Sequence, residues 1–428
     1  MSDSLVIKGG RVIDATGTRD ADVLVEGGHV TEIGTGLRGD RALDASDAIV
    51  APGLVDLHVH LREPGGEEAE TIETGARAAA LGGFTAIVAM PNTEPPQDDP
   101  AVVSSVLGKG ATSLCDVHAA GAITIGRAGA ALAPMGELHA LGVRIFTDDG
   151  ACLASAGMMR AALEYARSLP GAVIAQHAED ETLATGHMHE GEWSSRLGIP
   201  GRPAAAEELV VARDCMLAEL TGTPVHFLHL STAGAIDLVR AAKARGIRVT
   251  AEAAPHHFTL TDAACQSFDP CFKVNPPLRT AADVAAVKAG LADGTIDAIA
   301  TDHAPHPTEA KERTFEEAPP GMLGVETALA LAITELVEPG VLPIADALAR
   351  LSWGPAAIAG LTDHGGPIAL DAVANLCVID PLLEWTVDAT KLASRAHNTP
   401  YDGRRLTGRV RHTVLRGEPV VTDGEARR

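Results

Sequence analysis

Two histidines near residue 60 are separated by a single residue inside an apolar run. In the segment Leu54-Val-Asp-Leu-His-Val-His-Leu-Arg62, His58 and His60 alternate with Leu57 and Val59. This period of two predicts a β-strand whose two imidazoles leave the same face. Neutral imidazoles are common ligands of divalent metals, although such a pair alone is more often solvated surface or core. The pair therefore points to half of a metal site, which other segments would have to complete.

Further histidines and aspartates stand at the ends of later strand-like runs. The segments that carry them are Phe146-Thr-Asp-Asp-Gly150, Gln176-His-Ala-Glu179, His226-Phe-Leu-His-Leu-Ser231 and Ala300-Thr-Asp-His303. Four histidines and two carboxylates exceed the needs of one tetrahedral zinc, but they suit two metals that share a bridging carboxylate. Two such cations lower the pKa of a shared water and polarise a carbonyl, and a neighbouring carboxylate can carry the water's proton to a leaving nitrogen. The residue set therefore predicts hydrolysis of an amide-like bond.

The elements that must position these residues follow a repeated strand-then-helix pattern. Eight strand-like runs alternate with alanine-rich, helix-compatible segments. The runs are Gly53–Leu61, Phe84–Met90, Asp116–Thr124, Val143–Asp149, Ala172–Ala178, Pro224–Ser231, Arg248–Pro255 and Asp297–Ala304. The pattern predicts an α/β fold, a (β/α)8 TIM barrel with its active site at the carboxyl ends of the strands. A doubly wound open sheet is the alternative, but no G-x-G-x-x-G and no G-K-[ST] phosphate loop supports it.

Both ends of the chain differ from this central region. Residues 1–50 contain short apolar runs separated by Gly-Gly pairs, and the same texture returns within residues 367–428. Short strands with glycine turns are typical of a β meander. We therefore expect the two termini to form one composite, β-sandwich-like domain (1–50 plus 367–428), with the metal-dependent barrel hydrolase domain at 51–366.

The amino-acid composition indicates which partners and which cellular compartment to expect. The 428 residues carry a formal net charge of −23, which argues against nucleic acid and anionic membranes as partners. The six cysteines are scattered without a C-x-x-C pair, as is typical of free thiols in a reducing compartment. The first residues lack the basic start and apolar run of a signal peptide. We expect a cytoplasmic protein, whose site for an anionic substrate needs local cations.

An ordered set of motifs resembles the dihydroorotases of the amidohydrolase superfamily. The set is V-D-L-H-V-H-L-R-E-P-G, A-M-P-N-T, F-T-D-D-G, Q-H-A-E, H-L-S-T, P-H-H, K-V-N-P-P-L-R, A-T-D-H-A-P-H and P-G-M-L-G-V-E-T, and it runs from Ala51 to about Thr327. The terminal β segments fit the small composite domain of the superfamily. The resemblance implies a metal-dependent cyclic amidohydrolase.

The resemblance also implies the metal ligands. His58 and His60 with Asp302 would bind the first metal, His177 and His229 the second, and Asp149 would bridge the two. Many relatives bridge with a carboxylated lysine, but no lysine occurs between Lys109 and Lys243, which places the chain with the aspartate-bridged, class I type. Asp148 competes with Asp149 for the bridge, because neighbours on a strand face opposite ways and only one can point inward. Asp302 would also act as general base toward the attacking water and general acid toward the ring nitrogen.

Substrate contacts are implied in the same way. A substrate carboxylate would be clamped by Arg62, whose planar fork suits it, together with Asn92, Asn275 and His306. Pro320 and Gly321 would offer backbone groups to the ring amide. Taken singly, Arg62 could instead form a surface ion pair with Glu63 or Glu67, and each asparagine could be a turn residue beside proline.

The function expected on this basis is the reversible cyclisation of N-carbamoyl-L-aspartate to L-dihydroorotate in de novo pyrimidine (UMP) synthesis, with two divalent metals, for which zinc is our expectation. One alternative is a hydantoinase- or allantoinase-like hydrolase of neutral rings, for which Arg62 would be dispensable. Another is a non-catalytic scaffold homologue. The expected partners are the small-molecule substrate, an aspartate transcarbamoylase, and a second copy of the chain in a homodimer or higher oligomer.

Overall fold

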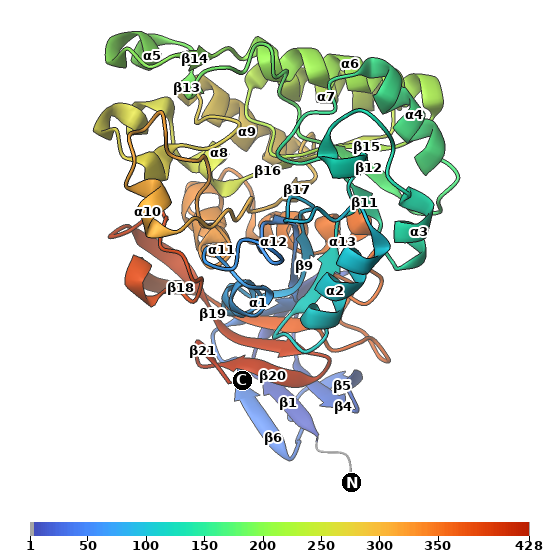
Figure 1. Ribbon diagram of the computed structural model, residues 1–428. Helices are drawn as coiled ribbons and strands as arrows, with labels where there is room; N and C mark the ends of the chain where they lie inside the picture. The colour runs from blue at the N-terminus through green and yellow to red at the C-terminus, as the bar shows by residue number, and fades with distance from the viewer. Residues whose placement is uncertain (1–3, 428) are drawn as a thin grey trace.

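The computed structural model describes residues 4–427, and its central feature is a closed barrel of parallel strands (Figure 1). Each of the eight strands lies within one of the runs predicted from the sequence. They are β8 (Leu54–Val59), β9 (Phe84–Ala89), β10 (Asp116–Ala119), β11 (Ile145–Phe146), β12 (Val173–Gln176), β15 (Val225–Phe227), β16 (Val249–Ala253) and β17 (Ala298–Ile299). The predicted TIM-barrel fold is confirmed.

The barrel closes through single bridges between two arcs of the sheet. One arc has the order β10-β9-β8 and the other β11-β12-β15-β16-β17. Parallel bridges join Gly121 to Phe146 on one side and Val59 to His303 on the other. The His60 amide donates to the His303 carbonyl at 2.9 Å, which fixes the first strand beside the last. All eight carboxyl ends therefore open on one mouth.

Helices follow the strands and cover the outside of the barrel (Figure 1). They are α1 (Ile72–Leu81), α2 (Pro100–Gly110), α3 (Met135–Ala140), α4 (Ala156–Ala166), α5 (Glu192–Leu197), α6 (Ala205–Thr221), α7 (Ala233–Ala244), α8 (Pro255–Thr259), α9 (Ala281–Asp293), α10 (Thr308–Lys311), α11 (Ala328–Ala332), α12 (Ile344–Leu351) and α13 (Trp353–Ala359). Local chemistry fixes where several begin. Thr71 and Thr280 form capping boxes at α1 and α9, and Asp99 caps α2 with Pro100 in its first turn.

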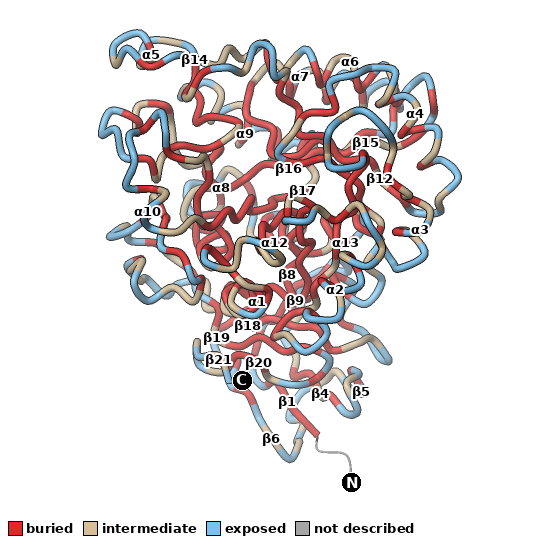
Figure 2. The backbone as a smooth tube through the Cα atoms, viewed as in Figure 1, coloured by how far each residue is buried: buried red, intermediate tan, exposed pale blue. Residues whose placement is uncertain are grey.

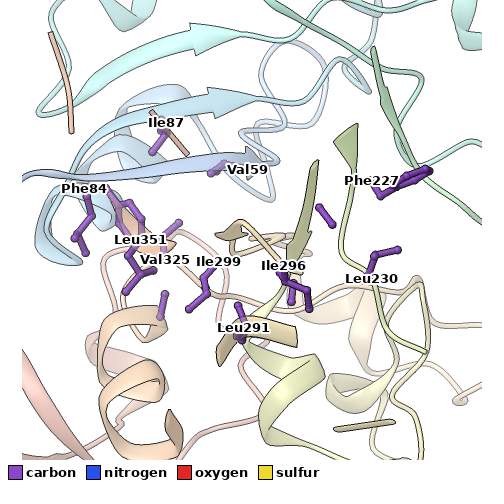
Figure 3. Close-up of a cluster of buried hydrophobic side chains, with 14 of the residues drawn as sticks. Val59, Phe84, Ile87, Phe227, Leu230, Leu291, Ile296, Ile299, Val325 and Leu351 are labelled. Atoms are coloured by element: carbon purple, nitrogen blue, oxygen red, sulfur yellow. The ribbon is translucent and has the colours of Figure 1, made fainter. Parts of the chain in front are cut away.

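The core lies between these helices and the strands. The strands are coloured as buried over most of their length, whereas the outer faces of the helices are exposed (Figure 2). Side chains from strands and helices interleave there, for example Phe84 and Ile87 of β9, Phe227 of β15 and Leu291 of α9 (Figure 3). Continuous burial of parallel strands on both faces explains why they read as apolar runs in the sequence.

Below the barrel lie two further sheets, one built from N-terminal strands alone and the other from strands of both termini (Figure 1). The strands are β1 (Leu5–Lys8), β2 (Arg11–Asp14), β3 (Gly17–Asp20), β4 (Asp22–Glu26), β5 (His29–Gly34), β6 (Arg41–Asp44), β7 (Ile49–Pro52), β18 (Leu376–Thr386), β19 (Arg405–Leu415), β20 (Glu418–Thr422) and β21 (Glu425–Ala426). One sheet has the order β5-β4-β1-β6, and the other has β21-β20-β19-β18-β7-β2-β3. Residues such as Leu5, Val12 and Val378 form a separate buried cluster. The division of the chain at residues 50 and 366 stays a prediction.

Several strands end earlier than the sequence pattern predicts. The last predicted run ends at Ala304, but β17 ends at Ile299, and the run to Asp149 contains only Ile145–Phe146 as a strand. The cause is visible in the backbone, because Asp302 has a φ of 47° and leaves the extended conformation. Residues beyond the strand ends turn toward the mouth of the barrel.

Two further findings concern the cysteines and the helices. The six cysteines are free thiols, five of them buried. Among residues 4–427, no helix combines the length and apolar character needed to cross a membrane.

Candidate metal centre

The six predicted metal ligands meet at the mouth of the barrel. His58 lies on β8 and His60 directly after it, while the others follow the ends of β11, β12, β15 and β17. All six side chains are buried: His58, His60, Asp149, His177, His229 and Asp302. Separate strands deliver them because the carboxyl ends of barrel strands converge.

Asp149 occupies the centre of this group. Its Oδ2 lies 3.3 Å from His58 Nε2 and 3.5 Å from His60 Nε2. Its Oδ1 lies 3.3 Å from His177 Nδ1 and 3.4 Å from His229 Nε2. One carboxylate oxygen therefore faces each histidine pair, which is the arrangement required of a bridge between two cations.

Asp302 completes the first half of the group. Its Oδ1 lies 3.1 Å from His60 Nε2 and 3.6 Å from His58 Nε2. The side chains of His58, His60 and Asp302 offer ligand atoms within 4.8 Å of one another, as do those of His58, Asp149 and His229. These spacings suit coordination by a cation lying between the atoms.

The unpartnered atoms of the group fit a metal. His58 Nε2, Asp149 Oδ2 and His229 Nδ1 are buried without a hydrogen-bond partner among the described residues. Buried polar atoms are seldom left unpaired, because each costs free energy. For His58 and Asp149 the unpaired atoms face each other across the space where a cation would lie.

The electrostatics favour positive charge at the same place. Burial opposes charge on both Asp149 and His58, but their mutual attraction outweighs it, lowering the pKa of Asp149 well below its usual range and raising that of His58. For Asp302, burial is outweighed by the close approach of His60 Nε2 and the field of His58, so its pKa is also lowered. The carboxylates are thus ionised and available as ligands.

Asp148 turns away from this group. Its Oδ1 accepts hydrogen bonds from the amides of Ile123 and Thr124 at 2.9 and 3.0 Å, and its Oδ2 accepts the Thr124 hydroxyl at 2.5 Å. A carboxylate occupied in this way cannot serve as a bridge. Of the two adjacent aspartates, Asp149 is the one that faces the histidines.

Neighbouring groups fix which nitrogen each histidine presents. His58 Nδ1 lies 2.8 Å from Glu252 Oε1, and His60 Nδ1 lies 2.8 Å from Asn92 Oδ1. Each Nδ1–H donates to its oxygen, which leaves the Nε2 lone pair directed at the carboxylates. Asn92, predicted as a substrate contact, therefore also orients a histidine.

Two buried acids near the predicted ligands, Glu252 and Glu179, were not predicted to have a role from the sequence. Glu252 is fully buried on β16, and its second oxygen lies 3.0 Å from His226 Nε2. Burial opposes its charge, but the hydrogen bonds from His226 and His58 lower its pKa to about 2. Glu179 Oε2 lies 3.5 Å from His177 Nε2 and 2.8 Å from Arg202 Nη1. The ion pair with Arg202 offsets the free-energy cost of burying the Glu179 charge. The sequence did contain a signal for Glu252, which is the single acid within the strand Val249–Ala253. A charged residue buried in such a strand needs a partner.

The predicted substrate contacts line one cavity with the metal centre. This cavity of about 210 Å³ is bounded by His60, Arg62, Asn92, Asp149, His177, His229, Asn275, Asp302, His306, Pro320 and Gly321. The Arg62 Nε donates to the Pro305 carbonyl at 3.1 Å, which holds the guanidinium beside His306. Burial and the charge of Arg62 lower the pKa of His306 to about 3, so its neutral ring donates to the Pro320 carbonyl at 2.8 Å.

Backbone strain is concentrated around the same cavity. Arg62, Arg127, His229 and Asp302 have φ values of 60°, 55°, 32° and 47°, respectively, and all four line the cavity. Residues other than glycine rarely adopt this region, at a cost of about 1–3 kcal/mol each. Such strain persists where surrounding contacts dictate a side-chain position, as expected at a functional site.

Comparison with known proteins agrees with this geometry. Residues 47–235 match the family described as Dihydro-orotase-like. A dihydroorotase of Streptomyces coelicolor is 49% identical over 99% of this chain and 100% of its own length. A dihydroorotase of Mycobacterium tuberculosis is 48% identical over 95% of this chain and 96% of its own.

The fold also matches solved structures. An L-hydantoinase (dihydropyrimidinase) from Arthrobacter aurescens superimposes with a TM-score of 0.89 and 27% identity, covering 100% of this chain and 97% of that chain. The relatives and the solved structure are all cyclic amidohydrolases. The dihydroorotases are 49% and 48% identical to this chain over almost its full length, whereas the hydantoinase is 27% identical. The chain therefore belongs to the dihydroorotase family.

Proposed function

We propose that this site interconverts N-carbamoyl-L-aspartate and L-dihydroorotate in pyrimidine synthesis. The observation that supports this most directly is the composition of one cavity. It joins a cluster of metal-binding side chains to Arg62, the cation suited to a substrate carboxylate. A neutral ring such as hydantoin would bring no carboxylate to this partly buried guanidinium.

His58, His60 and Asp302 would hold one divalent cation, His177 and His229 the other, and Asp149 both. When bound, the two cations lower the pKa of a water and polarise the amide carbonyl. Glu252 and Asn92 keep the Nε2 atoms of His58 and His60 free of protons and directed inward. Zinc is our proposal because histidine and carboxylate ligands suit it, although cobalt and manganese accept the same donors.

Asp302 is proposed to move the proton. Its ionised carboxylate lies at the edge of the cavity, 3.1 Å from His60. In ring opening it would take a proton from the attacking water as the new C–O bond forms at the amide carbon. It would then give this proton to the ring nitrogen as the C–N bond breaks. Ring closure runs through the same steps in reverse and releases water.

Arg62, Asn92, Asn275 and His306 are proposed to hold the carboxylate that both substrates share. The Oδ1 of Asn92 accepts from His60, so its amide NH2 is the part available to an anion. His306 is neutral and held by the Pro320 carbonyl, and Gly321 continues the same wall. With its carboxylate held at this wall, the substrate would present its ring amide to Asp302.

The test is ring opening of L-dihydroorotate by purified protein, with metal content measured on the same sample. Hydantoin and allantoin serve as parallel substrates, and Arg62→Met as the matched variant. We expect selective turnover of dihydroorotate with close to two metals per chain, and a raised KM in the variant. Turnover of the neutral rings alone, or an unchanged KM in Arg62→Met, would overturn the proposal.

We also propose a homodimer or higher oligomer and an aspartate transcarbamoylase as partner, both of which rest on the family resemblance. Size-exclusion chromatography with light scattering, with and without a purified transcarbamoylase, tests both. A monomeric protein with full activity and no shift in mass on mixing would contradict them. A cytoplasmic location stays a prediction.

A further inference from the structure

Asn398 is a buried asparagine behind the cavity wall that His306, Pro320 and Gly321 form. It lies in the segment between β18 and β19 and is 4% exposed. Its Oδ1 accepts from the His306 amide at 3.1 Å, and its Nδ2 donates to the carbonyls of Ala304 and Gly321 at 3.0 and 3.2 Å. A carboxamide offers both an acceptor and two donors, so one side chain makes all three bonds. The residue lies outside the motifs that carry the family resemblance.

The segment that carries Asn398 is tied to the barrel at further points. The Asn398 carbonyl accepts from the Leu323 amide at 3.1 Å. Upstream, the Ala393 amide donates to Glu326 Oε1 at 2.7 Å. This segment lies within residues 367–428, which the sequence pattern groups with the small β-rich domain. A part of the chain outside the predicted barrel therefore supports the wall of the barrel cavity.

The bond to the His306 amide orients one peptide group of this wall. The Pro305 carbonyl and the His306 amide belong to the same trans peptide, whose C=O and N–H point in opposite directions. Asn398 holds the N–H side, and Arg62 Nε donates to the C=O side at 3.1 Å. The side chain of Asn398 therefore fixes the plane to which the guanidinium of Arg62 is bonded.

The other two bonds join the two loops that meet at the wall. Ala304 follows β17, whereas Gly321 lies beside Pro320 in the next loop along the chain. The His306 ring spans the same two loops, because it donates to the Pro320 carbonyl at 2.8 Å. Loss of the Asn398 amide would therefore free the His306 ring to shift with its loop.

Asp302, the proposed proton carrier, is anchored by different bonds. The residue before it, Thr301, donates through its amide and its hydroxyl to Asp56 at 3.0 and 2.6 Å. The carbonyl of the residue after it, His303, accepts from the His60 amide at 2.9 Å. Separate parts of the chain thus position the group that moves a proton and the wall that holds the substrate.

We propose that Asn398 is a positioning residue for the substrate carboxylate, which acts through the Pro305–His306 peptide on Arg62 and His306. The inference rests on the proposed function, in which these two side chains hold the carboxylate that both substrates share. That carboxylate is present before and after ring closure, so loss of Asn398 should weaken binding of both substrates equally. Such a uniform loss raises both KM values by one factor and leaves kcat unchanged. It also preserves the ratio of the two kcat/KM values, which the equilibrium constant fixes.

The experiment measures kcat and KM in both directions for the metal-loaded wild-type enzyme and Asn398→Ala. We expect both KM values to rise about tenfold, as for loss of about one hydrogen bond to a charged group. Both kcat values should stay within about twofold, and metal content should stay at the wild-type value. Because much of the effect passes through Arg62, Asn398→Ala should raise KM less than about threefold in an Arg62→Met background.

Asn375 provides the matched control, because it is an equally buried asparagine beside the start of a barrel strand. Its carbonyl accepts from the amide of Gly53, which precedes β8. Its Nδ2 donates to the Asp363 carbonyl at 2.9 Å, and its Oδ1 accepts from the Arg416 amide at 2.7 Å. Asn375→Ala should lower the thermal midpoint, as Asn398→Ala does, but leave both KM values within about twofold.

Should Asn398→Ala fail to fold, Asn398→Ser takes its place. The serine hydroxyl can keep one of the three bonds, so both KM values should still rise at least about threefold. The control and the Arg62→Met background remain the same.

An unchanged KM in either direction, or a fall in kcat without a rise in KM, would overturn the inference. The same rise in KM in the Arg62→Met background would do so too, because Asn398 would then act independently of Arg62. Equal KM shifts in Asn375→Ala would reduce the effect to a general loss of stability. Absence of turnover in the wild-type enzyme would reject the proposed function and this inference with it, whereas the other outcomes reject the inference alone.

Discussion

Two groups of histidines and carboxylates lie at opposite ends of the barrel strands, and they differ in how their polar atoms are used. At the mouth, four histidines surround Asp149 and Asp302, and atoms such as His58 Nε2 lack hydrogen-bond partners. Asp116, the first residue of β10, belongs to the second group with His364. There His364 Nε2 lies 3.1 Å from Asp116, while its Nδ1 lies 3.0 Å from the Thr85 hydroxyl.

This difference separates a binding site from a structural network. In the Asp116–His364 group, hydrogen bonds saturate both ring nitrogens of His364, and the second oxygen of Asp116 pairs with Arg416. Neither His364 nor Asp116 therefore keeps an open valence for a metal, although the nearby His118 Nε2 is buried without a hydrogen-bond partner among the described residues. At the mouth, facing lone pairs remain open, because the partner that would satisfy them is a cation. Residue type alone would not have distinguished the two groups.

The largest effect should come from exchanging one carboxylate in each group. Asp302→Asn keeps the shape of the side chain but cannot accept the proton of the attacking water, so kcat should fall at least about 10³-fold. Asp116→Asn should leave kcat within about twofold. Ring opening of dihydroorotate is measured alongside the thermal midpoint. An active Asp302→Asn enzyme would remove Asp302 from the proton path.

Substitution of one histidine in each group tests the difference between them through metal content. His58→Ala should lose bound metal and with it turnover, because the side chain serves both ligand groups around Asp149 and Asp302. His364→Ala should keep metal but leave the Thr85 hydroxyl and one oxygen of Asp116 without a partner, at a cost of about 1–3 kcal/mol in the free energy of unfolding. Metal analysis and urea titration check both variants. A metal-depleted His364→Ala would contradict the structural assignment.

Glu252 connects the mouth to the barrel interior, and its loss should be milder. Glu252→Gln keeps one acceptor for His58 but removes the charge that fixes the imidazole, so metal affinity should fall about 10–100-fold. Activity at saturating metal should recover most of the wild-type value, which distinguishes a positioning residue from a ligand. Activity is titrated against free metal at several concentrations. If excess metal fails to restore turnover, Glu252 has a further role.

Much of the fold could be predicted from the sequence because barrel strands are buried on both faces. Each of the eight apolar runs contains a strand, and the order of motifs along the chain placed the predicted metal ligands at one mouth. The strand ends were less predictable. Residues such as His229 and Asp302 leave the extended conformation under contacts made by distant segments, and no local pattern records those contacts.

The same reason limited the prediction of the site. Alternation along a strand showed that either Asp148 or Asp149 points inward, but the choice depends on the amides of Ile123 and Thr124. Arg127 lies in the glycine-containing segment Ile125–Gly129, which reads as an ordinary surface turn. Its place in the cavity wall follows from tertiary hydrogen bonds to Asp148.

The smallest effect concerns His118, which lies beside His364 with ring centroids 6.1 Å apart. Burial, followed by the charge of His364, lowers the pKa of His118 to about 4. In the unfolded chain its pKa is about 6.5. Between these values the unfolded chain binds more protons, so stability is full above about pH 6.5 and is lost as the pH falls toward 4.

His118→Leu should therefore reduce the loss of unfolding free energy between pH 6.5 and 5 by about 1–2 kcal/mol. Urea titrations of both proteins at the two pH values measure this difference, and equal losses would show that His118 is not the residue that senses acid. Such a result would leave the Asp116–His364 pair to account for any sensitivity at this end of the barrel.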